Sequence, residues 1–408
     1  MAVNLQIPAQ SDIHAVKGVD IGIAAAGIRK VDHPDLTVFK LAPNTAVAGV
    51  FTTNRFRAAP VQVCEVHLSS DHDTQALVIN TGNANAATGD TGMEHARRTC
   101  SEAAELLDLR PSQVLPFSTG VILEPLPIEK IVASLPAAVN DLRPDNWFAA
   151  AHSIMTTDTQ PKIYSTQLPL GNTTTTITGI SKGAGMIKPN MATMLGFLAT
   201  DAGVAPELLK EMTRSIANAS FNRISVDGDT STNDSFIIMA TGQNGVQIDS
   251  VASPHYATLF ASLKAAALDL AQKIVRDGEG ATKFITIQVD EATSRAEALK
   301  VAYAVAQSPL IKTAFFASDP NLGRILCAIG YAGIKDLDIS KVRLWLGDVL
   351  VATKGGRNPD YQEADGQRVM QAEEITVRIG LGRGHDTETV YTCDFSHEYV
   401  SINADYRS

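Results

Sequence analysis

Residues 182–201, KGAGMIKPNMATMLGFLATD, join a glycine-rich segment with two lysines to a short apolar run. The run from Met194 to Ala199 ends at Thr200 and Asp201, and a short apolar run bounded by polar residues is typical of a buried strand. Thr193 stands where the glycine-rich segment meets this run, so one hydroxyl lies at the start of the predicted strand. The sequence therefore predicts a core strand here and makes Thr193 a candidate nucleophile.

Thr193 has a catalytic and a structural interpretation. A threonine hydroxyl is a weak nucleophile unless a base lies beside it, and its own α-amino group becomes that base if the preceding peptide bond is cut. The catalytic hypothesis therefore requires self-cleavage between Ala192 and Thr193. In the alternative, which composition alone favours, the segment is only a turn into a strand, and Lys182 and Lys188 are solvated. The catalytic hypothesis gains weight if the substrate is an anion, because Lys182 is suited to pair with a carboxylate.

The composition of the 408-residue chain limits its class. It is 45% hydrophobic and 19% charged, which indicates a soluble globular protein of two or three domain-sized units. A formal net charge of -10 argues against a general binder of nucleic acids or anionic membranes, and no stretch approaches the roughly 20 apolar residues that cross a bilayer. The N-terminal residues lack a secretory pattern, which predicts a cytoplasmic protein. The scattered cysteines are predicted to be buried free thiols, at Cys64, Cys100, Cys327 and Cys393.

Hydrophobic periodicity predicts a mixed α and β protein. Helical spacing occurs at residues 93–107, 206–219, 256–276 and 294–306, and short apolar runs at residues 77–79, 236–239 and 284–289 predict strands. Strand-like segments at residues 341–352, 374–380 and 388–395 predict an antiparallel C-terminal unit from about residue 290 to 408. Thr173–Thr176 predicts an exposed strand or loop.

Three further loops have candidate roles beside a structural alternative. Residues 116–121 are suited to a turn in which Thr119 and Gly120 converge on an oxyanion, although a plain tight turn explains them unless Thr193 is the nucleophile. Residues 277–283 are predicted to be a helix C-terminus and turn, from which Glu279 projects into a cleft and assists proton transfer or orients an amine. Residues 225–235 lack EF-hand spacing and predict a hydrogen-bonded polar turn, and no metal site is predicted anywhere.

In combination, several segments resemble the ornithine acetyltransferase family of arginine biosynthesis, whose members act as glutamate N-acetyltransferases and in part as amino-acid acetyltransferases. The segments are residues 80–86, 118–120, 156–159, 182–201, 278–283, 319–324 and 403–406. Each is weakly specific alone, but together they are specific and span essentially the whole chain. Leu322 departs from the family pattern, in which tryptophan is expected, and it lies outside the proposed chemistry.

The resemblance implies a precursor that cuts itself before Thr193, giving an alpha chain of residues 1–192 and a beta chain of residues 193–408. It also implies an α+β fold with a layered α/β/β/α core, similar to that of the self-processing aminopeptidases, and a strand-rich C-terminal unit. The two chains are expected to stay associated as a heterotetramer containing two of each.

The activity implied by the resemblance is ping-pong transfer of an acetyl group from N-acetylornithine to glutamate, which yields ornithine and N-acetylglutamate. Thr193 is the nucleophile, and Thr119 and Gly120 stabilise the oxyanion. The residues implied to contact substrate are Thr156, Lys182, Thr193, Glu279, Asn403 and Ser408. No cofactor is implied, and the motifs leave open whether acetyl-CoA also serves as a donor.

The C-terminal tail is predicted to be ordered, because the alternation at residues 399–402 indicates a strand that returns Asn403 and Ser408 to the site. Two rival functions stay open. One is a self-processing aminopeptidase or amidase that uses the same threonine with water as acceptor. The other is an uncut, non-catalytic protein whose glycine-rich loops bind a carboxylate or phosphate.

Overall fold

The computed structural model describes residues 2–29, 33–70, 73–188 and 194–405, which form two compact units. The larger unit comprises Gln6–Asn222 and Asp229–Ile274. The smaller unit comprises Arg223–Gly228, the chain from Val275 onward and a short N-terminal segment ending at Leu5. The main segment of the smaller unit thus begins at Val275, near the end of the helix over residues 256–276. This is about fifteen residues before the boundary expected near residue 290.

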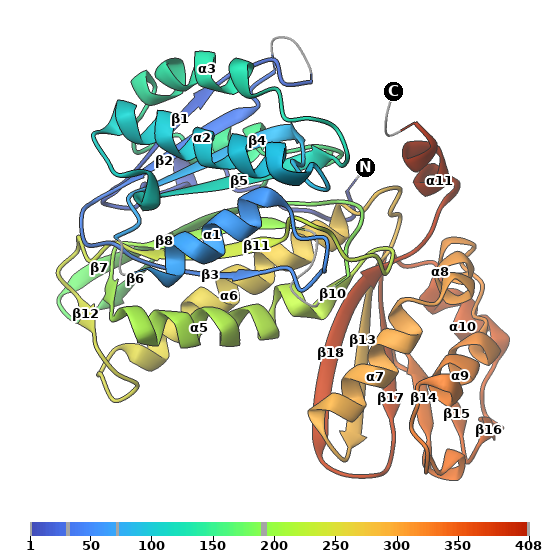
Figure 1. Ribbon diagram of the computed structural model, residues 1–408. Helices are drawn as coiled ribbons and strands as arrows, with labels where there is room; N and C mark the ends of the chain where they lie inside the picture. The colour runs from blue at the N-terminus through green and yellow to red at the C-terminus, as the bar shows by residue number, and fades with distance from the viewer. Residues whose placement is uncertain (1, 30–32, 71–72, 189–193, 406–408) are drawn as a thin grey trace. The chain divides into compact units, whose positions relative to one another are not determined.

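The larger unit contains two sheets that face each other across an apolar core (Figure 1). The four-stranded sheet has the order β1 (Val19–Ala24), β2 (Leu36–Leu41), β4 (Ala76–Asn83), β5 (Val114–Val121). The five-stranded sheet has the order β3 (Ala46–Phe51), β11 (Ser235–Ala240), β8 (Leu195–Thr200), β7 (Thr173–Lys182), β6 (Lys162–Leu170). Phe197 of β8 meets Phe39 at 5.7 Å and Phe117 at 5.1 Å between ring centroids, so the two inner faces interlock.

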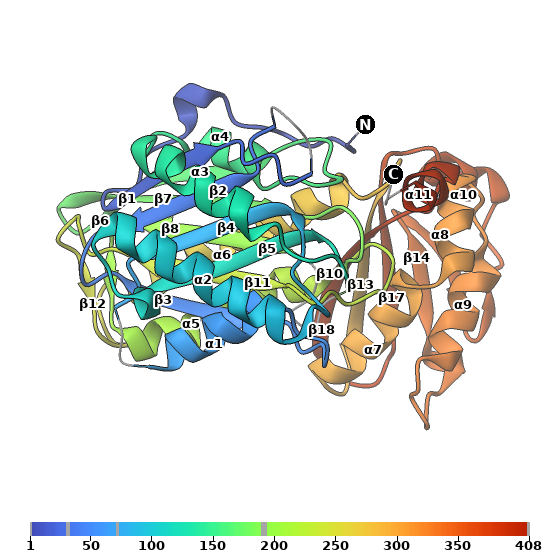
Figure 2. The same ribbon diagram turned by 45° about the horizontal axis from the view of Figure 1, so that its top comes forward.

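Helices cover the outer faces of both sheets (Figures 1 and 2). α2 (Gly89–Leu107) and α3 (Ile128–Asn140) share an apolar cluster with the outer face of the four-stranded sheet. α5 (Pro206–Ala219) packs on β3 and β11, and α6 (Tyr256–Arg276) is tied to β6 by a 2.7 Å hydrogen bond from Lys273 Nζ to the Ile163 carbonyl. The predicted α/β/β/α layering is therefore confirmed.

Further elements complete the larger unit. α1 (Ala59–Ser69) contacts β5 and α2, and α4 (Trp147–Ser153) inserts Trp147 into the core between the sheets. The short strands β9 (Gly203–Val204) and β12 (Gln247–Ile248) pair with each other. Among the described residues, no helix has both the length and the apolar character needed to cross a membrane.

The smaller unit is a mixed sheet with helices on one face. Its strand order is β10 (Ile224–Ser225), β18 (Asp386–Cys393), β13 (Phe284–Ala292), β17 (Glu374–Gly380), β14 (Arg343–Leu346), β15 (Val349–Thr353), β16 (Gly356–Arg357). Its core joins this sheet to α7 (Arg295–Ala306), α8 (Pro309–Phe316), α9 (Leu322–Tyr331) and α10 (Glu363–Met370). The predicted strand-rich unit is confirmed, but the antiparallel prediction is wrong in part, because β13 pairs with β17 and β10 with β18 in parallel.

Several local predictions agree with the structure. The predicted helices over residues 206–219 and 256–276 match α5 and α6, and Pro206 occupies the first turn. The run after Thr193 forms β8, whose residues are all buried. Ser294 caps α7 by accepting a hydrogen bond from the Glu297 N–H.

Other local predictions are wrong. Residues 399–402 are not a strand but part of α11 (His397–Ala404), which begins where the Ser396 hydroxyl accepts the Glu398 N–H. Residues 116–121 are not a turn, because β5 continues its parallel pairing with β4 as far as Val121. Thr175 and Thr176 are buried within β7 rather than exposed, and Cys327 is an exposed thiol, unlike the other three cysteines.

Candidate active site

Lys182 lies at the end of β7 and connects two of the predicted site residues. Its ammonium group donates to the Thr156 hydroxyl at 2.8 Å and to the Thr119 hydroxyl at 3.1 Å. Thr119 comes from β5 of the opposite sheet, and Thr156 follows α4. Residues separated by 26 and 63 positions in the chain are thus brought to one point of the larger unit. The side chain of Lys182 is only 8% exposed, so its ammonium group is held away from bulk water.

The backbone at Gly120 has a conformation that requires glycine. The register of β4 against β5 shifts at Gly82 and Asn83, next to Gly120. Gly120 has a φ of 136°, and a Cβ there would lie 2.2 Å from the Gly82 carbonyl carbon. The irregularity lies directly beside Thr119, whose hydroxyl accepts a hydrogen bond from Lys182.

A polar network behind β5 fixes this strand end. The side-chain amide of Asn233 donates to the carbonyls of Ser118 at 2.9 Å and Ala84 at 2.6 Å. The Ser118 hydroxyl donates to Asn80 Oδ1 at 2.5 Å. Sequence reasoning placed Asn80 in a family segment and Asn233 in a polar turn, but it assigned neither a role. Both hold Ser118, and through it the neighbouring Thr119, in place.

Asp158 supports the Lys182 side of the site. Its carboxylate accepts hydrogen bonds from Lys162 Nζ at 2.6 Å, the Gly183 N–H at 2.7 Å and the Thr156 N–H at 3.0 Å. Burial alone would raise the pKa of Asp158, but the charges of Lys162 and Lys182 and the Gly183 N–H outweigh it and hold the pKa well below its usual range. The carboxyl group is therefore ionised at any working pH.

Asp234, directly before β11, is a buried acid of the opposite kind. It is 1% exposed, and neither carboxyl oxygen has a hydrogen-bond partner among the described residues. Burial raises its pKa well above the usual range, and this is offset only in part by the charge of Lys182 and by the nearby Met194 N–H and Thr52 hydroxyl, which lie outside hydrogen-bonding geometry. It follows Asn233 in the chain, and the next residue, Ser235, donates its N–H to the Met194 carbonyl at 3.0 Å.

The smaller unit brings Glu279 and Asn403 together. The Asn403 side-chain amide donates to Glu279 Oε2 at 2.7 Å, so the helix α11 that replaces the predicted strand still joins these two predicted site residues. Asp394 fixes the loop that bears Glu279, because it accepts the Thr282 and Lys283 N–H groups, both at 2.8 Å. Glu279 itself is 6% exposed.

The cleavage residues Ala192 and Thr193, and the predicted substrate contact Ser408, lie outside the described residues. β8 begins at Leu195, and its register partner on β7 is Lys182. In the sequence, Thr193 therefore precedes β8, which is the direct neighbour of β7, the strand that ends at Lys182.

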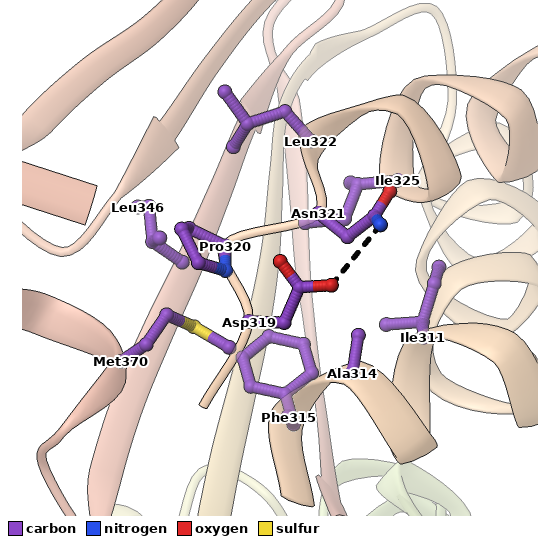
Figure 3. A pocket seen from close by; sticks show the side chains of 10 residues that line it. All are labelled: Ile311, Ala314, Phe315, Asp319, Pro320, Asn321, Leu322, Ile325, Leu346 and Met370. Atoms are coloured by element: carbon purple, nitrogen blue, oxygen red, sulfur yellow. Dashed lines mark hydrogen bonds between the residues drawn. The ribbon is translucent and has the colours of Figure 1, made fainter. Parts of the chain in front are cut away.

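Neither a metal centre nor the cavity in the smaller unit adds to this description. Among the described residues, no group of three or more His, Cys, Asp or Glu side chains is placed to hold a metal ion. A cavity of about 10 Å³ in the smaller unit lies beside Leu322 and Asp319, where Phe315 and Met370 also contact it (Figure 3). It is far smaller than the roughly 300 Å³ of a typical ligand site, so it is a packing defect rather than a pocket.

A family model matches nearly the whole chain, and solved structures of known proteins match about half of it. The model of the ArgJ family matches residues 20–408. The arginine biosynthesis bifunctional protein ArgJ of Bacillus halodurans is 37% identical over a match covering 52% of this chain and 99% of that chain, with a TM-score of 0.50. The ornithine acetyltransferase of Mycobacterium tuberculosis, solved in complex with ornithine, is 31% identical over 43% of this chain and 93% of that chain, with a TM-score of 0.38.

Proposed function

The chain belongs to the ArgJ family, and we propose that it is an acetyltransferase of arginine biosynthesis that moves the acetyl group of N-acetylornithine to glutamate through an acetylated Thr193. The carrying observation is the Lys182 cluster, in which a buried ammonium group binds the hydroxyls of Thr119 and Thr156. Such a cluster supplies a charge for a carboxylate and a hydroxyl donor for an oxyanion within one small volume.

Self-cleavage between Ala192 and Thr193 is the first step of the proposal. It would leave pieces of 192 and 216 residues from the 408-residue chain. The Bacillus halodurans chain supports this step, because a match to almost all of it takes up only 52% of the present chain. The new α-amino group would have a pKa of about 7.7–8.0, so a large fraction is neutral near pH 8 and able to accept the hydroxyl proton.

Acetyl transfer then proceeds in two half-reactions. The Thr193 oxygen attacks the acetyl carbonyl of N-acetylornithine, and the Thr119 O–H and Gly120 N–H donate to the oxyanion. Because Lys182 donates to Thr119 Oγ1, the hydrogen of that hydroxyl remains for the oxyanion. Ornithine leaves as the amine takes up the proton from the Thr193 α-ammonium group. The amine of glutamate then attacks the acetyl-threonine ester, which gives N-acetylglutamate and restores Thr193.

Substrate recognition in the proposal uses the residues common to both half-reactions. Lys182 and Thr156 bind the α-carboxylate that N-acetylornithine and glutamate share, and Glu279 and Asn403 are further proposed substrate contacts. No cofactor is required. We further propose a cytoplasmic heterotetramer of two alpha and two beta chains, and acetyl-CoA is a candidate second donor.

Intact-mass spectrometry and a transfer assay test the proposal together. Purified protein should appear as two fragments divided between residues 192 and 193, and Thr193→Ala should appear as one uncut chain without transfer activity. Thr174→Ala, which alters an exposed threonine on β7, is the matched control and should be cut and active. An uncut wild-type chain would refute the proposal, and acetate release without transfer to glutamate would identify an amidase instead.

A further inference from the structure

In the described part of the chain, β5 is an edge strand of the four-stranded sheet, so its outer backbone groups face side chains rather than another strand. The carbonyls of alternate residues point to the same edge of a strand. The Val114 carbonyl oxygen lies 2.8 Å from His67 Nδ1, and the Pro116 carbonyl accepts the Cys64 thiol at 3.0 Å. Both side chains belong to α1, which therefore covers this part of the edge.

The next carbonyl in this row, that of Ser118, is bound from the chain that enters the five-stranded sheet. The side-chain amide of Asn233 donates to the Ser118 carbonyl at 2.9 Å and to the Ala84 carbonyl at 2.6 Å. Its own oxygen accepts the Thr232 hydroxyl at 2.5 Å, so the donors and the acceptor of this amide are engaged. One buried side chain thus ties the ends of β4 and β5 to the residues that precede β11.

The same residues are connected to β8. β11 begins two residues after Asn233 and is the direct neighbour of β8. The Ser235 N–H donates to the Met194 carbonyl at 3.0 Å, and Ser235 is in register with Leu195. The Ser235 hydroxyl donates to the Asn233 carbonyl at 3.1 Å, which fixes the short step between them. The backbone that follows the candidate nucleophile in the sequence is therefore linked to the end of β5 by three consecutive residues.

We propose that Asn233 is a positioning residue, which holds the strand that follows the nucleophile at a fixed distance from the Thr119 and Gly120 end of β5. The inference rests on the proposed function, in which Thr193 attacks a carbonyl whose oxyanion is bound at this end, and it adds a residue to which that reaction assigns no role. A misplacement of reacting groups by about 1 Å can cost about 100-fold in rate. Loss of the Asn233 amide should therefore slow acetyl transfer more than it weakens substrate binding.

The carboxylate-binding side of the proposed site has a separate anchor. The Asp158 carboxylate accepts the Thr156 N–H at 3.0 Å and the Gly183 N–H at 2.7 Å, which fixes the backbone beside the groups proposed to bind the α-carboxylate. Asn233→Ala leaves both of these bonds in place and removes the two donors to the ends of β4 and β5. We therefore expect the affinity for ornithine to change less than about threefold, and the rate of acetyl transfer to fall at least about 30-fold.

Asn146→Ala is the matched control. Asn146 is buried in the same unit, and its side-chain amide donates to the Ile21 carbonyl at 2.9 Å and to Asp141 Oδ2 at 2.8 Å. The control removes the same kind of buried amide at another place, so it should lower the stability without changing the affinity or the rate. Calorimetric titration with ornithine measures the affinity, and transfer from N-acetylornithine to glutamate by the cleaved protein measures the rate.

Hydrogen exchange measures the link between the two strands without requiring turnover. In Asn233→Ala, peptides from β5 and from β8 should both exchange at least about tenfold faster relative to peptides from α2, because one side chain connects the two strands. In Asn146→Ala, neither strand should change relative to α2. If Asn233→Ala does not accumulate as folded protein, Asn233→Ser, whose shorter side chain cannot reach both carbonyls, takes its place in every measurement.

Each outcome decides the inference. A transfer rate in Asn233→Ala within threefold of the wild type, an equal fall in Asn146→Ala, or a loss of ornithine affinity as large as the loss of rate would overturn it, as would faster exchange in only one strand or in neither. A wild type without acetyl transfer would instead reject the proposed function. In that case, or if the variant stays uncut, the exchange comparison decides alone whether Asn233 holds the two strands together.

Discussion

Asp234→Asn should make the protein more stable at neutral pH, although it replaces a buried residue beside the candidate site. The Asp234 carboxyl is buried and has no hydrogen-bond partner within the described part of the chain, and its pKa is raised well above 3.8. Asparagine has nearly the same shape and no charge. The substitution therefore removes an ionisable group from a site that cannot solvate its charge.

The sign of the pH dependence follows from the raised pKa. A carboxyl whose pKa is higher in the folded state binds its proton more tightly there than in the unfolded chain. Its contribution favours folding below the unfolded value of 3.8 and is lost as the pH rises toward the folded pKa. The stability of the wild type should therefore fall, relative to Asp234→Asn, by at most about 1.4 kcal/mol per pH unit.

The expected size of the effect is set by ionisation alone, because an asparagine at this site would also be a buried polar group without a partner. With a slope of at most about 1.4 kcal/mol per pH unit above pH 3.8, the two proteins should be nearly equal in stability at pH 4 and differ by about 1–3 kcal/mol at pH 8. For a unit of this size the gain corresponds to roughly 2–12 °C in melting temperature.

Melting temperatures from pH 4 to 8 measure this effect, and both proteins should carry Thr193→Ala, so that chain cleavage does not contribute. Asp35→Asn is the matched control, because Asp35 is 2% exposed but its two oxygens accept the Ala26 and Ile28 N–H groups at 2.6 Å. In Asp35→Asn the side-chain NH2 group would face one of these two N–H donors, so this variant should be less stable than its parent at pH 7. Parallel curves for Asp234→Asn and its parent would contradict the reasoning.

Two further predictions concern the candidate site. Gly120→Ala should lower the free energy of unfolding by about 3 kcal/mol and abolish transfer, because the added Cβ would lie 2.2 Å from the backbone of β4. Denaturant unfolding measures this effect. The control is Gly330→Ala at an uncrowded glycine in a helix, which should instead raise stability by up to about 1 kcal/mol. Asn403→Ala should raise the KM of N-acetylornithine about fivefold with cleavage intact, because Glu279 loses a 2.7 Å hydrogen bond. Steady-state kinetics measure this KM, and an equal rise in Ser401→Ala, on the same helix, would contradict the prediction.

Periodicity predicted the elements whose own residues determine their structure. α5 and α6 carry helical apolar spacing along their whole length, and β8 is a buried apolar run, so local pattern and final structure agree. Residues 399–402 alternate like a strand but form a helix, because Ser396 supplies an N-cap that a reading of apolar residues overlooks. The parallel pairing of β5 with β4 was missed at residues 116–121 for a different reason, since it depends on a partner more than thirty residues away.

The residue types at the site were predictable from the sequence, but the contacts that distinguish one lysine from another were not. Lys162, Lys182 and Lys188 look alike in the sequence, and only the pairing of β6 with β7 places the first two at one carboxylate. Asp158 lies in a segment that resembles the family, yet nothing in that segment indicates that its oxygens reach the Gly183 N–H, 25 positions away. Such assignments need the register of a sheet, which no local pattern contains.

The charge of this cluster links the fold to the proposed chemistry. A single lysine at the end of a buried strand would need its own carboxylate partner, and that partner would then compete with the substrate for its charge. Asp158 instead accepts a direct hydrogen bond from Lys162, while the Lys182 ammonium group donates to the hydroxyls of Thr119 and Thr156. The position of Lys162 at the start of β6, antiparallel to β7 and opposite Ser181, makes this possible, because it brings a second ammonium group to the carboxylate that also accepts the Gly183 N–H.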